Sequence, residues 1–307
     1  MIVYFPSVTT PVRRFAAVAA LGAVLVGCGT DGADPAPAAL KPSSSPTAAG
    51  PAPASPQPGN PRGQGAEQRR RAPTLAPGPH GLTPVFRRAA APAATAPRTV
   101  ALTFDADMTA DQGPRAARGE HFDNPGLIAA LRALKVPSTV FMTGRWAEEY
   151  PAQAKAIGTD PLFEIANHSY SHHAFTSGCY GLPVVAPQDM RADVERAFTA
   201  FEKAGARNVV PYFRFPGGCY DDGALRAIAP AQVTAVQWDV VSGDAFATDA
   251  DAVAEQVLAG VRPGSLVVMH CTRSAAPVTE EAVRRIVPEL RRRGYRFVKV
   301  SDLMRAS

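Results

Sequence analysis

Three of the six histidines in the chain lie within residues 167–173, whose sequence is NHSYSHH. His168 and His172 are four residues apart, and on a helical turn this spacing places both imidazoles on one face, close enough to bind one metal ion. His173 has the wrong spacing to share that face, so we expect it to be a non-ligand. A catalytic zinc ion also needs an oxygen ligand and an open position for water. A polar loop with solvated histidines is the alternative, and spacing alone leaves both interpretations open.

From residue 99 onward, short apolar runs alternate with amphipathic stretches of helical length. The expected strands are residues 100–104, 138–142, 162–166, 212–215, 233–237, 266–269 and 296–300. The expected helices are residues 125–134, 147–157, 187–204, 223–228, 249–258 and 279–293. This alternation predicts an α/β domain with a parallel sheet and crossover helices. Its size favours a distorted, roughly seven-stranded (β/α) barrel, closed or nearly closed.

In such barrels the functional residues lie at the C-terminal ends of the strands. Five of the expected strands are followed by polar clusters. These clusters contain Asp105 and Asp107, His168 and His172, Arg214, Asp239 and Asp244, and His270. Each cluster alone is a weak signal, because an aspartate at a strand end is often a helix cap and a lone histidine is often a hydrogen-bonded core residue. Five clusters after five strands are hard to attribute to packing, and they predict an active site.

With these residues the domain resembles the polysaccharide deacetylases of carbohydrate esterase family 4, the NodB-homology group. The five ordered motifs of that family are matched by Thr103-Phe104-Asp105, His168-Ser169-x-x-His172, Arg214-Phe215-Pro216-Gly217, Trp238 to Asp244, and Leu266-x-Val268-x-His270. Order and spacing both match over essentially all of residues 99–307. The resemblance implies a NodB-like fold and a metal-dependent amidase that acts on N-acetylated sugars.

The resemblance also implies roles for individual residues. Asp105 would be the general base, and Arg214 would orient it and keep it charged. His270 would be the general acid that protonates the departing sugar nitrogen. Asp244 best matches the family's second aspartate in the fourth motif and would support His270, with Asp239 as the alternative.

By this resemblance a divalent metal, Zn²⁺, would be held by one carboxylate with His168 and His172, and would activate the attacking water. The family's second aspartate directly follows the first, but that position is Ala106 here. Residues two apart on a strand share a face, so we predict that Asp107 supplies the metal carboxylate. The alternatives are that Asp105 itself binds the metal, or that only two protein ligands remain and the site is impaired.

The link that follows this first motif is long and polar. His121 and Asp123 lie in it, as candidates for further ligands or for lining the substrate groove.

Residues 1–27 are predicted to be an export signal, with two arginines at its positive end and an apolar run too short for a comfortable membrane span. The run ends in Leu-Val-Gly before Cys28, which resembles a bacterial lipobox. An ordinary export signal with a chance cysteine is the alternative. Residues 28–98 are rich in Pro, Ala, Gly and Ser and are expected to form a disordered linker. We therefore expect an exported protein, lipid-anchored through Cys28 to the outer face of the bacterial cell membrane.

The positive charge of the chain lies in its first third. Residues 1–98 contain ten Lys and Arg side chains against three acidic ones, whereas the whole chain has a net charge of +5, so residues 99–307 have a net charge of −2. The composition therefore gives no basic folded domain, and we expect no nucleic-acid partner. The Arg69–Arg71 run is expected to be solvated, to be a protease site, or to contact anionic wall polymer or lipid head groups.

Three cysteines remain once Cys28 is assigned to the anchor. In an oxidising compartment, one disulfide and one thiol is the simplest arrangement. Cys179 and Cys219 both lie in Gly-Cys-Tyr segments, so we predict that they pair and leave Cys271 free.

Three functions compete at this stage. The first is an N-deacetylase of an extracellular N-acetylated glycan, acting as a monomer. The second is an esterase that removes O-acetyl groups from a polysaccharide. The third is a non-catalytic glycan-binding module, which Ala106 favours, although such a module has no reason to keep Asp105 and His270 together.

Overall fold

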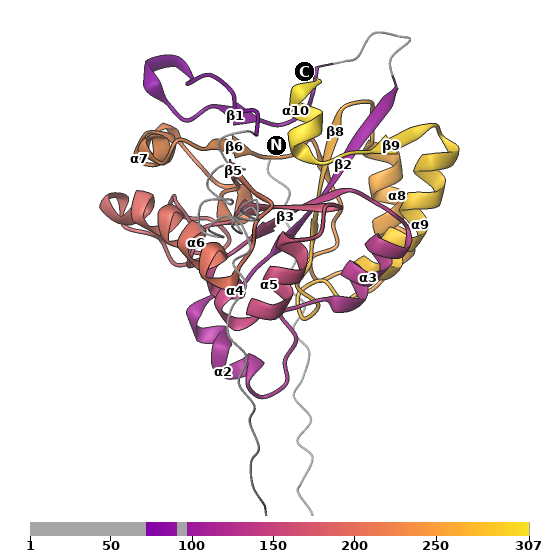
Figure 1. Ribbon diagram of the computed structural model, residues 1–307, viewed down its shortest axis with the longest axis horizontal. Coiled ribbons are helices and arrows are strands. Elements are labelled where there is room, and N and C mark those ends of the chain that lie inside the picture. Colours follow the sequence, from indigo (N-terminus) through magenta and orange to yellow (C-terminus); the bar gives the residue numbers. More distant parts are fainter. Residues whose placement is uncertain (1–71, 91–96, 307) are drawn as a thin grey trace, which may run out of the picture. The chain divides into compact units, whose positions relative to one another are not determined.

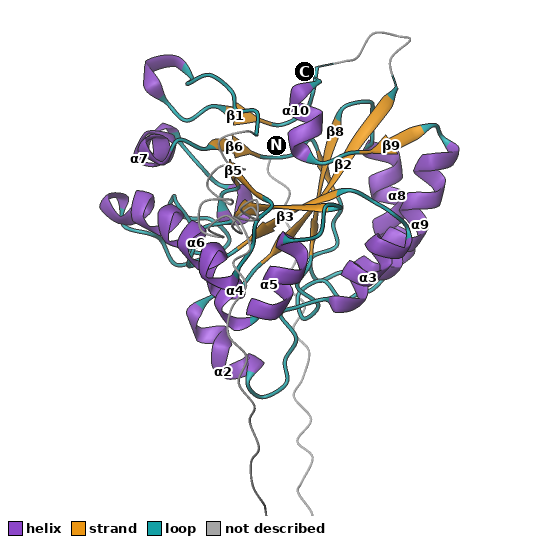
Figure 2. Cartoon of the chain, viewed as in Figure 1, coloured by secondary structure: helices purple, strands orange, loops and turns teal. Residues whose placement is uncertain are grey.

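The computed structural model describes residues 72–90 and 97–306, and these residues form an α/β domain around one curled parallel sheet (Figures 1 and 2). Neighbouring strands follow the order β1-β6-β5-β4-β3-β2-β8-β7, and β9 pairs with β2. The strands are β1 (Val85–Phe86), β2 (Arg98–Ala106), β3 (Ser138–Met142), β4 (Phe163–Asn167), β5 (Val209–Phe213), β6 (Thr234–Val236), β7 (Val240–Val241), β8 (Ser265–His270) and β9 (Tyr295–Phe297). Because all pairings are parallel, the carboxyl ends of the strands lie at one edge of the sheet.

Helices connect the strands and cover the sheet. They are α2 (Gly113–Ala116), α3 (Pro125–Ala133), α4 (Gly144–Glu149), α5 (Pro151–Gly158), α6 (Met190–Ala204), α7 (Asp222–Ile228), α8 (Ala250–Gly260), α9 (Thr279–Arg292) and α10 (Val300–Arg305). Local sequence sets their ends: Asn124 caps α3 through its side chain, and Gly205 ends α6 with a φ of 83°. A side-chain cap and a glycine thus set these two helix ends.

The central strand β2 separates two cores. Val100, Leu102, Phe104 and Ala106 face the core shared with the helices, whereas Ala101 belongs to the core enclosed by the curled sheet. This alternation follows from the period of two along a strand. It turns Asp105 away from the helices and toward the inside of the curl, where the polar residues of the neighbouring strand ends also lie.

The predicted (β/α) barrel architecture is confirmed, with differences in its strands. The structure has nine strands in the described part of the chain rather than seven, because β1 and β7 have only two residues each. The strand predicted at residues 296–300 is the shorter β9, and helix α10 starts at its predicted end. Within the described residues β1 and β7 are the two ends of the strand order, so the sheet is a half-open curl.

The prediction of one disordered linker over residues 28–98 is wrong for residues 72–90. Strand β1 pairs with β6, and the backbone N–H of Ala89 donates to Gly264 just before β8. Phe86 and Ala89 are buried in the inner core, and Leu75 packs against it. We call residues 72–90 the N-terminal strap. The strap is rich in alanine and proline, which is why the sequence suggested disorder, but it also contains a few large apolar residues that pack into the domain.

The sequence also led to predictions for the cysteines and for the N-terminal region. Cys179 and Cys219 form the predicted disulfide, and Cys271 is a buried free thiol. No helix among the described residues is both long and apolar enough to cross a membrane. The predicted signal sequence and the acylated Cys28 lie outside the described residues.

Candidate active site and metal centre

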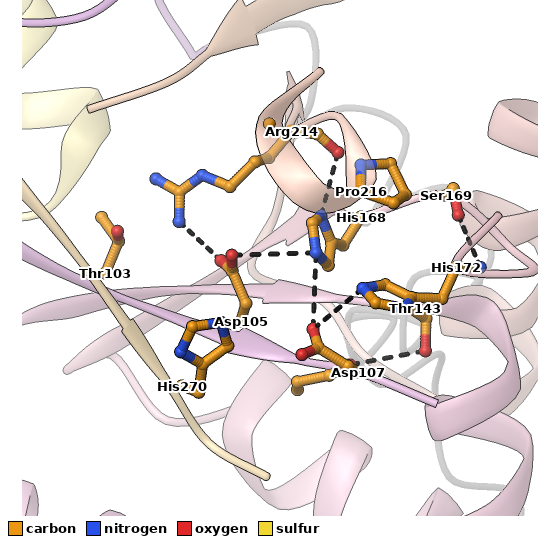
Figure 3. Close-up of polar contacts among 12 residues, drawn as sticks. Thr103, Asp105, Asp107, Thr143, His168, Ser169, His172, Arg214, Pro216 and His270 are labelled. Carbon is orange, nitrogen blue, oxygen red and sulfur yellow. Dashed lines mark hydrogen bonds and ion pairs between the residues drawn. The ribbon is translucent and has the colours of Figure 1, made fainter. Parts of the chain in front are cut away.

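The polar residues predicted at strand ends meet at the carboxyl edge of the sheet (Figure 3). Asp105 lies near the end of β2, and Asp107 is the first residue after the strand. His168 comes directly after β4, Arg214 directly after β5, and His270 is the last residue of β8. Four separate segments of the chain therefore deliver acidic, imidazole and guanidinium groups to one place.

Asp107, His168 and His172 form a compact group in which one ligand atom from each lies within 4.8 Å of the others. Oδ1 of Asp107 lies 3.4 Å from Nε2 of His168 and 3.6 Å from Nε2 of His172. All three side chains point toward one another in Figure 3. The structure thus places the carboxylate of Asp107, rather than that of Asp105, between the two imidazoles.

The two histidines converge without a helical turn, so the predicted geometry of this segment is wrong. Residues 168–173 form an irregular loop, in which Ser169 and His172 have φ angles of 69° and 57°. The turn is held by side-chain hydrogen bonds: Oδ1 of Asn167 accepts from the N–H of Ser169, and Oγ of Ser169 accepts from the N–H of His172, each over 2.8 Å. These bonds hold two residues in the left-handed region that side chains normally avoid.

The alternation along β2 turns the side chain at position 106 away from the site. The side chain of Ala106 is fully buried in the core beneath the helices, so an aspartate there would be buried against apolar side chains. Asp107 lies on the same side as Asp105, as the two-residue period predicts. Its backbone N–H donates to Oγ1 of Thr272 over 3.0 Å, which fixes the chain just beyond the strand.

Asp105 is paired with Arg214. Nη1 of Arg214 donates to Oδ1 of Asp105 over 2.5 Å, and Nε donates to the carbonyl of Val236. The guanidinium lies 3.8 Å from the ring centroid of Phe141, and the arginine is fully buried. The other oxygen of Asp105 lies 3.7 Å from Nε2 of His168, so this carboxylate is adjacent to the imidazole group without being part of the group of three.

His270 is held by Asp244. Oδ1 of Asp244 lies 2.8 Å from Nδ1 of His270, and Oδ2 accepts from the backbone N–H of the same histidine over 2.7 Å. Ser242 and Thr279 donate their hydroxyl groups to the same carboxylate. Asp239, the alternative partner of His270, instead accepts from Ser265 and from the N–H of Leu266 at the start of β8.

Burial and neighbouring charges set the protonation of these groups. Burial lowers the pKa of His172 to about 4, so its imidazole is neutral near pH 7. Burial opposes ionisation of Asp107, yet His172 and His168 outweigh it and lower the pKa of the carboxyl. Burial also acts against the charged form of His270, but the hydrogen bond to Asp244 and its charge raise the pKa to about 10. The site therefore combines an ionised carboxylate, a neutral imidazole and a protonated imidazole.

The donors around Asp107 fit a divalent cation. Oδ1 of Asp107 is buried and has no hydrogen-bond partner among the described residues. Nδ1 of His168 lies 2.9 Å from the carbonyl of Arg214, which only accepts, so Nδ1 carries hydrogen and Nε2 is left as the ligand atom. Four ligands at about 2.1 Å around a tetrahedral zinc ion are about 3.4 Å apart, close to the separations found here. Two imidazoles and one carboxylate also leave a position open for water.

Other candidate residues lie apart from this centre. His121 and Asp123 contact each other at 3.1 Å, and neither belongs to the group of three that forms the metal candidate. His173 is likewise outside that group. Sequence reasoning missed Thr272 and Thr279, which hold Asp107 and Asp244. Thr272 follows His270 by two residues, so the strand period was a signal for it, whereas nothing in the sequence singled out Thr279.

Comparison with known proteins agrees with this geometry. Residues 93–236 match the model of the family described as polysaccharide deacetylase. A chitooligosaccharide deacetylase of Sinorhizobium fredii is 28% identical over 211 residues, which covers 66% of this chain and 92% of the relative. A peptidoglycan-N-acetylglucosamine deacetylase of Bacillus cereus is 26% identical over 210 residues, which covers 68% of this chain and 89% of the relative.

Solved structures show the same fold. A family 4 pseudoenzyme from Bacillus anthracis superimposes with a TM-score of 0.57 at 23% identity, covering 75% of this chain and 70% of that one. The curled parallel sheet with acid and base groups at its carboxyl edge therefore defines a hydrolase of the deacetylase class on a NodB-like fold. Residues 93–236 match the polysaccharide deacetylase family, and the chain is similar to the two deacetylases named above over about two thirds of its length.

Proposed function

We propose that the protein is a metal-dependent hydrolase that removes N-acetyl groups from an extracellular glycan of N-acetylglucosamine or N-acetylmuramic acid units, such as peptidoglycan or a chitin-like polymer. The observation that carries this proposal is the group of Asp107, His168 and His172 beside two paired side chains, Asp105 with Arg214 and His270 with Asp244. The relatives named above support the substrate class, because the polymers in their names are built from N-acetylated sugars.

A divalent cation at the group of three would polarise the acetyl carbonyl and lower the pKa of the attacking water. Asp105 accepts a proton from that water, and Arg214 holds the carboxylate in place through its short hydrogen bond. His270 is charged near pH 7, because Asp244 raises its pKa to about 10, and it donates its proton to the departing nitrogen. The C–N bond of the acetamide breaks, and acetate and a free amine leave.

We propose Zn²⁺ as the cation, because its usual ligands are imidazole nitrogen and carboxylate oxygen, and catalytic zinc sites keep three protein ligands. The metal content of the purified protein, measured before and after chelation, tests this assignment. Refilling of the chelated protein with about one equivalent of zinc supports it, and a site that takes up no divalent metal at micromolar concentration contradicts it.

Acetate release is the test of the reaction. The whole protein is assayed on chitooligosaccharide, peptidoglycan and acetylated xylan, with and without chelator. Acetate from either of the first two, lost with chelator and restored with zinc, supports the N-deacetylase. Release from xylan alone would assign the protein to O-acetyl esterases, and retained glycan binding without any release would make it a binding module.

We also propose that the protein is exported and anchored by a lipid on Cys28. The lipobox-like end of the apolar run supports this location. Replacement of Cys28 by alanine should move the protein out of the membrane fraction that remains after a high-salt wash. Mass spectrometry of the mature N-terminus should find the lipid on Cys28 of the unmodified sequence, and an unacylated N-terminus elsewhere contradicts the anchor.

A further inference from the structure

One end of the domain carries a cluster of exposed cations. It comprises Arg98, Lys135, Arg262, Arg291, Arg292, Arg293 and Arg296, all exposed, and we call it the basic pole. Hydrogen bonds and strand pairing bring several of these residues together from distant parts of the chain. Nη1 of Arg98 donates to the carbonyl of Arg293, and Arg291 donates to the carbonyl of Lys135. Strand pairing places Thr99 beside Arg296.

Few acidic groups neutralise the basic pole. Glu289 pairs with both Arg292 and Arg293 at 2.7 Å. In the described ranges no carboxylate forms an ion pair with the other five cations. Asp160 and Asp302 lie near this end, but each has its own partner, Arg132 and Arg305 respectively. The pole is therefore strongly positive on a domain whose net charge over residues 99–307 is −2.

The basic pole lies at the end of the sheet opposite the active site. Arg98 begins β2, Arg262 precedes β8, and Arg296 lies in β9, whose pairing is with the first residues of β2. The start of β2 and β9 are seen together at the upper right of Figure 1. Asp105 and His270 lie at the other ends of β2 and β8. A surface that contacts the pole would thus leave the active site free.

The chain also enters the domain at the amino end of the sheet. The carbonyl of Pro73 accepts from the hydroxyl of Tyr212, and the N–H of Leu75 donates to Thr234, the first residue of β6. Three arginines, residues 69–71, directly precede the strap in the sequence. Seventy-one residues, including the Cys28 of the proposed anchor, precede the strap in the sequence.

We propose that the basic pole docks the domain onto the headgroups of anionic phospholipids, with the active site directed away from the bilayer toward the glycan. Guanidinium groups pair well with phosphate, and each basic residue near an anionic leaflet strengthens binding. Basic residues facing an anionic leaflet add to the affinity that a lipid anchor supplies. The inference rests on the proposed location but not on the deacetylase reaction.

Vesicle binding tests the proposal on the full chain carrying Cys28→Ser, so that acylation supplies no affinity. Vesicles of phosphatidylcholine with about 30 mol % phosphatidylglycerol are compared with pure phosphatidylcholine at about 0.1 M salt. The pole variant combines Arg262→Glu, Arg292→Glu and Arg296→Glu. The control variant combines Arg118→Glu, Arg191→Glu and Arg226→Glu, which are exposed residues elsewhere with the same total change of charge.

We expect binding to the anionic vesicles only, weakened about 100-fold or more in the pole variant and far less in the control variant. Acetate release from a soluble chitooligosaccharide should be equal in all three proteins, which shows that the variants fold. Absence of binding, or equal loss in both variants, overturns the proposal. Binding to soluble polyphosphate without binding to vesicles overturns the membrane as the partner and points to a polymer of phosphate instead. A protein that binds vesicles but releases no acetate would count against the reaction alone.

Discussion

Arg214 donates a hydrogen bond to Oδ1 of Asp105 over 2.5 Å, and both side chains are buried at the end of the sheet. The backbone carbonyl of the same arginine lies 2.9 Å from Nδ1 of His168. One residue therefore orients the proposed base with its side chain and a proposed metal ligand with its main chain. Substitution of the side chain should disturb the base while leaving the contact to the histidine in place.

Replacement of Arg214 by methionine should lower both stability and turnover. Loss of the guanidinium leaves the buried carboxylate of Asp105 without its charged partner, which costs about 3–5 kcal/mol of unfolding free energy. Urea unfolding measures this change. Arg226→Met on the exposed face of α7 is the matched control and should stay within about 0.5 kcal/mol of the native protein. Equal effects of the two variants would show that the pair with Asp105 contributes little.

The two carboxylates of β2 should separate metal binding from turnover. Asp107→Ala removes the oxygen ligand and should weaken zinc binding about 100-fold or more. Asp105→Asn keeps all three donors of the group, so it should bind zinc nearly normally and lose acetate release. Zinc competition with a chromogenic chelator measures the first effect, with His173→Ala as a control that keeps its affinity. The reverse pattern would mean that the roles of the two aspartates are exchanged.

Replacement of Asp244 by asparagine should change the pH dependence of the reaction. The pKa of His270 is raised to about 10 by the hydrogen bond and charge of Asp244, so this acid is protonated below that pH and is lost as pH rises through it. Without the carboxylate the pKa should fall toward the ordinary value near 6.5. The alkaline limb of kcat/KM should therefore move to lower pH. An alkaline limb that stays in place in Asp244→Asn would exclude His270 as the acid that titrates there.

The N-terminal strap should contribute measurably to stability. Phe86 is 5% exposed and packs in the core enclosed by the sheet, so Phe86→Ala should cost about 3 kcal/mol or more. Phe246, which is 83% exposed, is the matched control, and Phe246→Ala should change stability by less than about 0.5 kcal/mol. A chain that starts at residue 99 should unfold at lower temperature than one that starts at residue 72, because it exposes the edge of β6. Equal melting temperatures would contradict a structural role for the strap.

The sequence was sufficient for the features that depend on regular periodicity. The apolar runs that became β2, β3, β4 and β8 located the strand ends, and the period of two placed Asp107 on the side of Asp105. The structure bears out that placement, because Oδ1 of Asp107 lies between the two imidazoles. Because each polar cluster follows a predicted strand, the sequence also predicted that Arg214 and His270 lie at the same edge of the sheet.

Other features could not be read from periodicity, because they depend on contacts between distant residues. The turn at Ser169 and His172 has positive φ angles stabilised by hydrogen bonds, so its spacing suggested a helix that does not form. Strands β1 and β7 have two residues each, too few to show a pattern. The net charge of residues 99–307 likewise gave no sign of the basic pole, because a total charge does not show where the cations lie on the surface.

The fully buried Ala106 has a consequence for how active members of such a family are recognised. A search that inspects only the residue after the first aspartate finds a methyl group here and would classify the protein as inactive. The carboxylate lies instead one residue later, on the correct side of the strand. Catalytic competence must therefore be judged from the position of the carboxylate oxygen in space. Two sequences whose motif aspartates differ by one position can present the same oxygen donor to a cation.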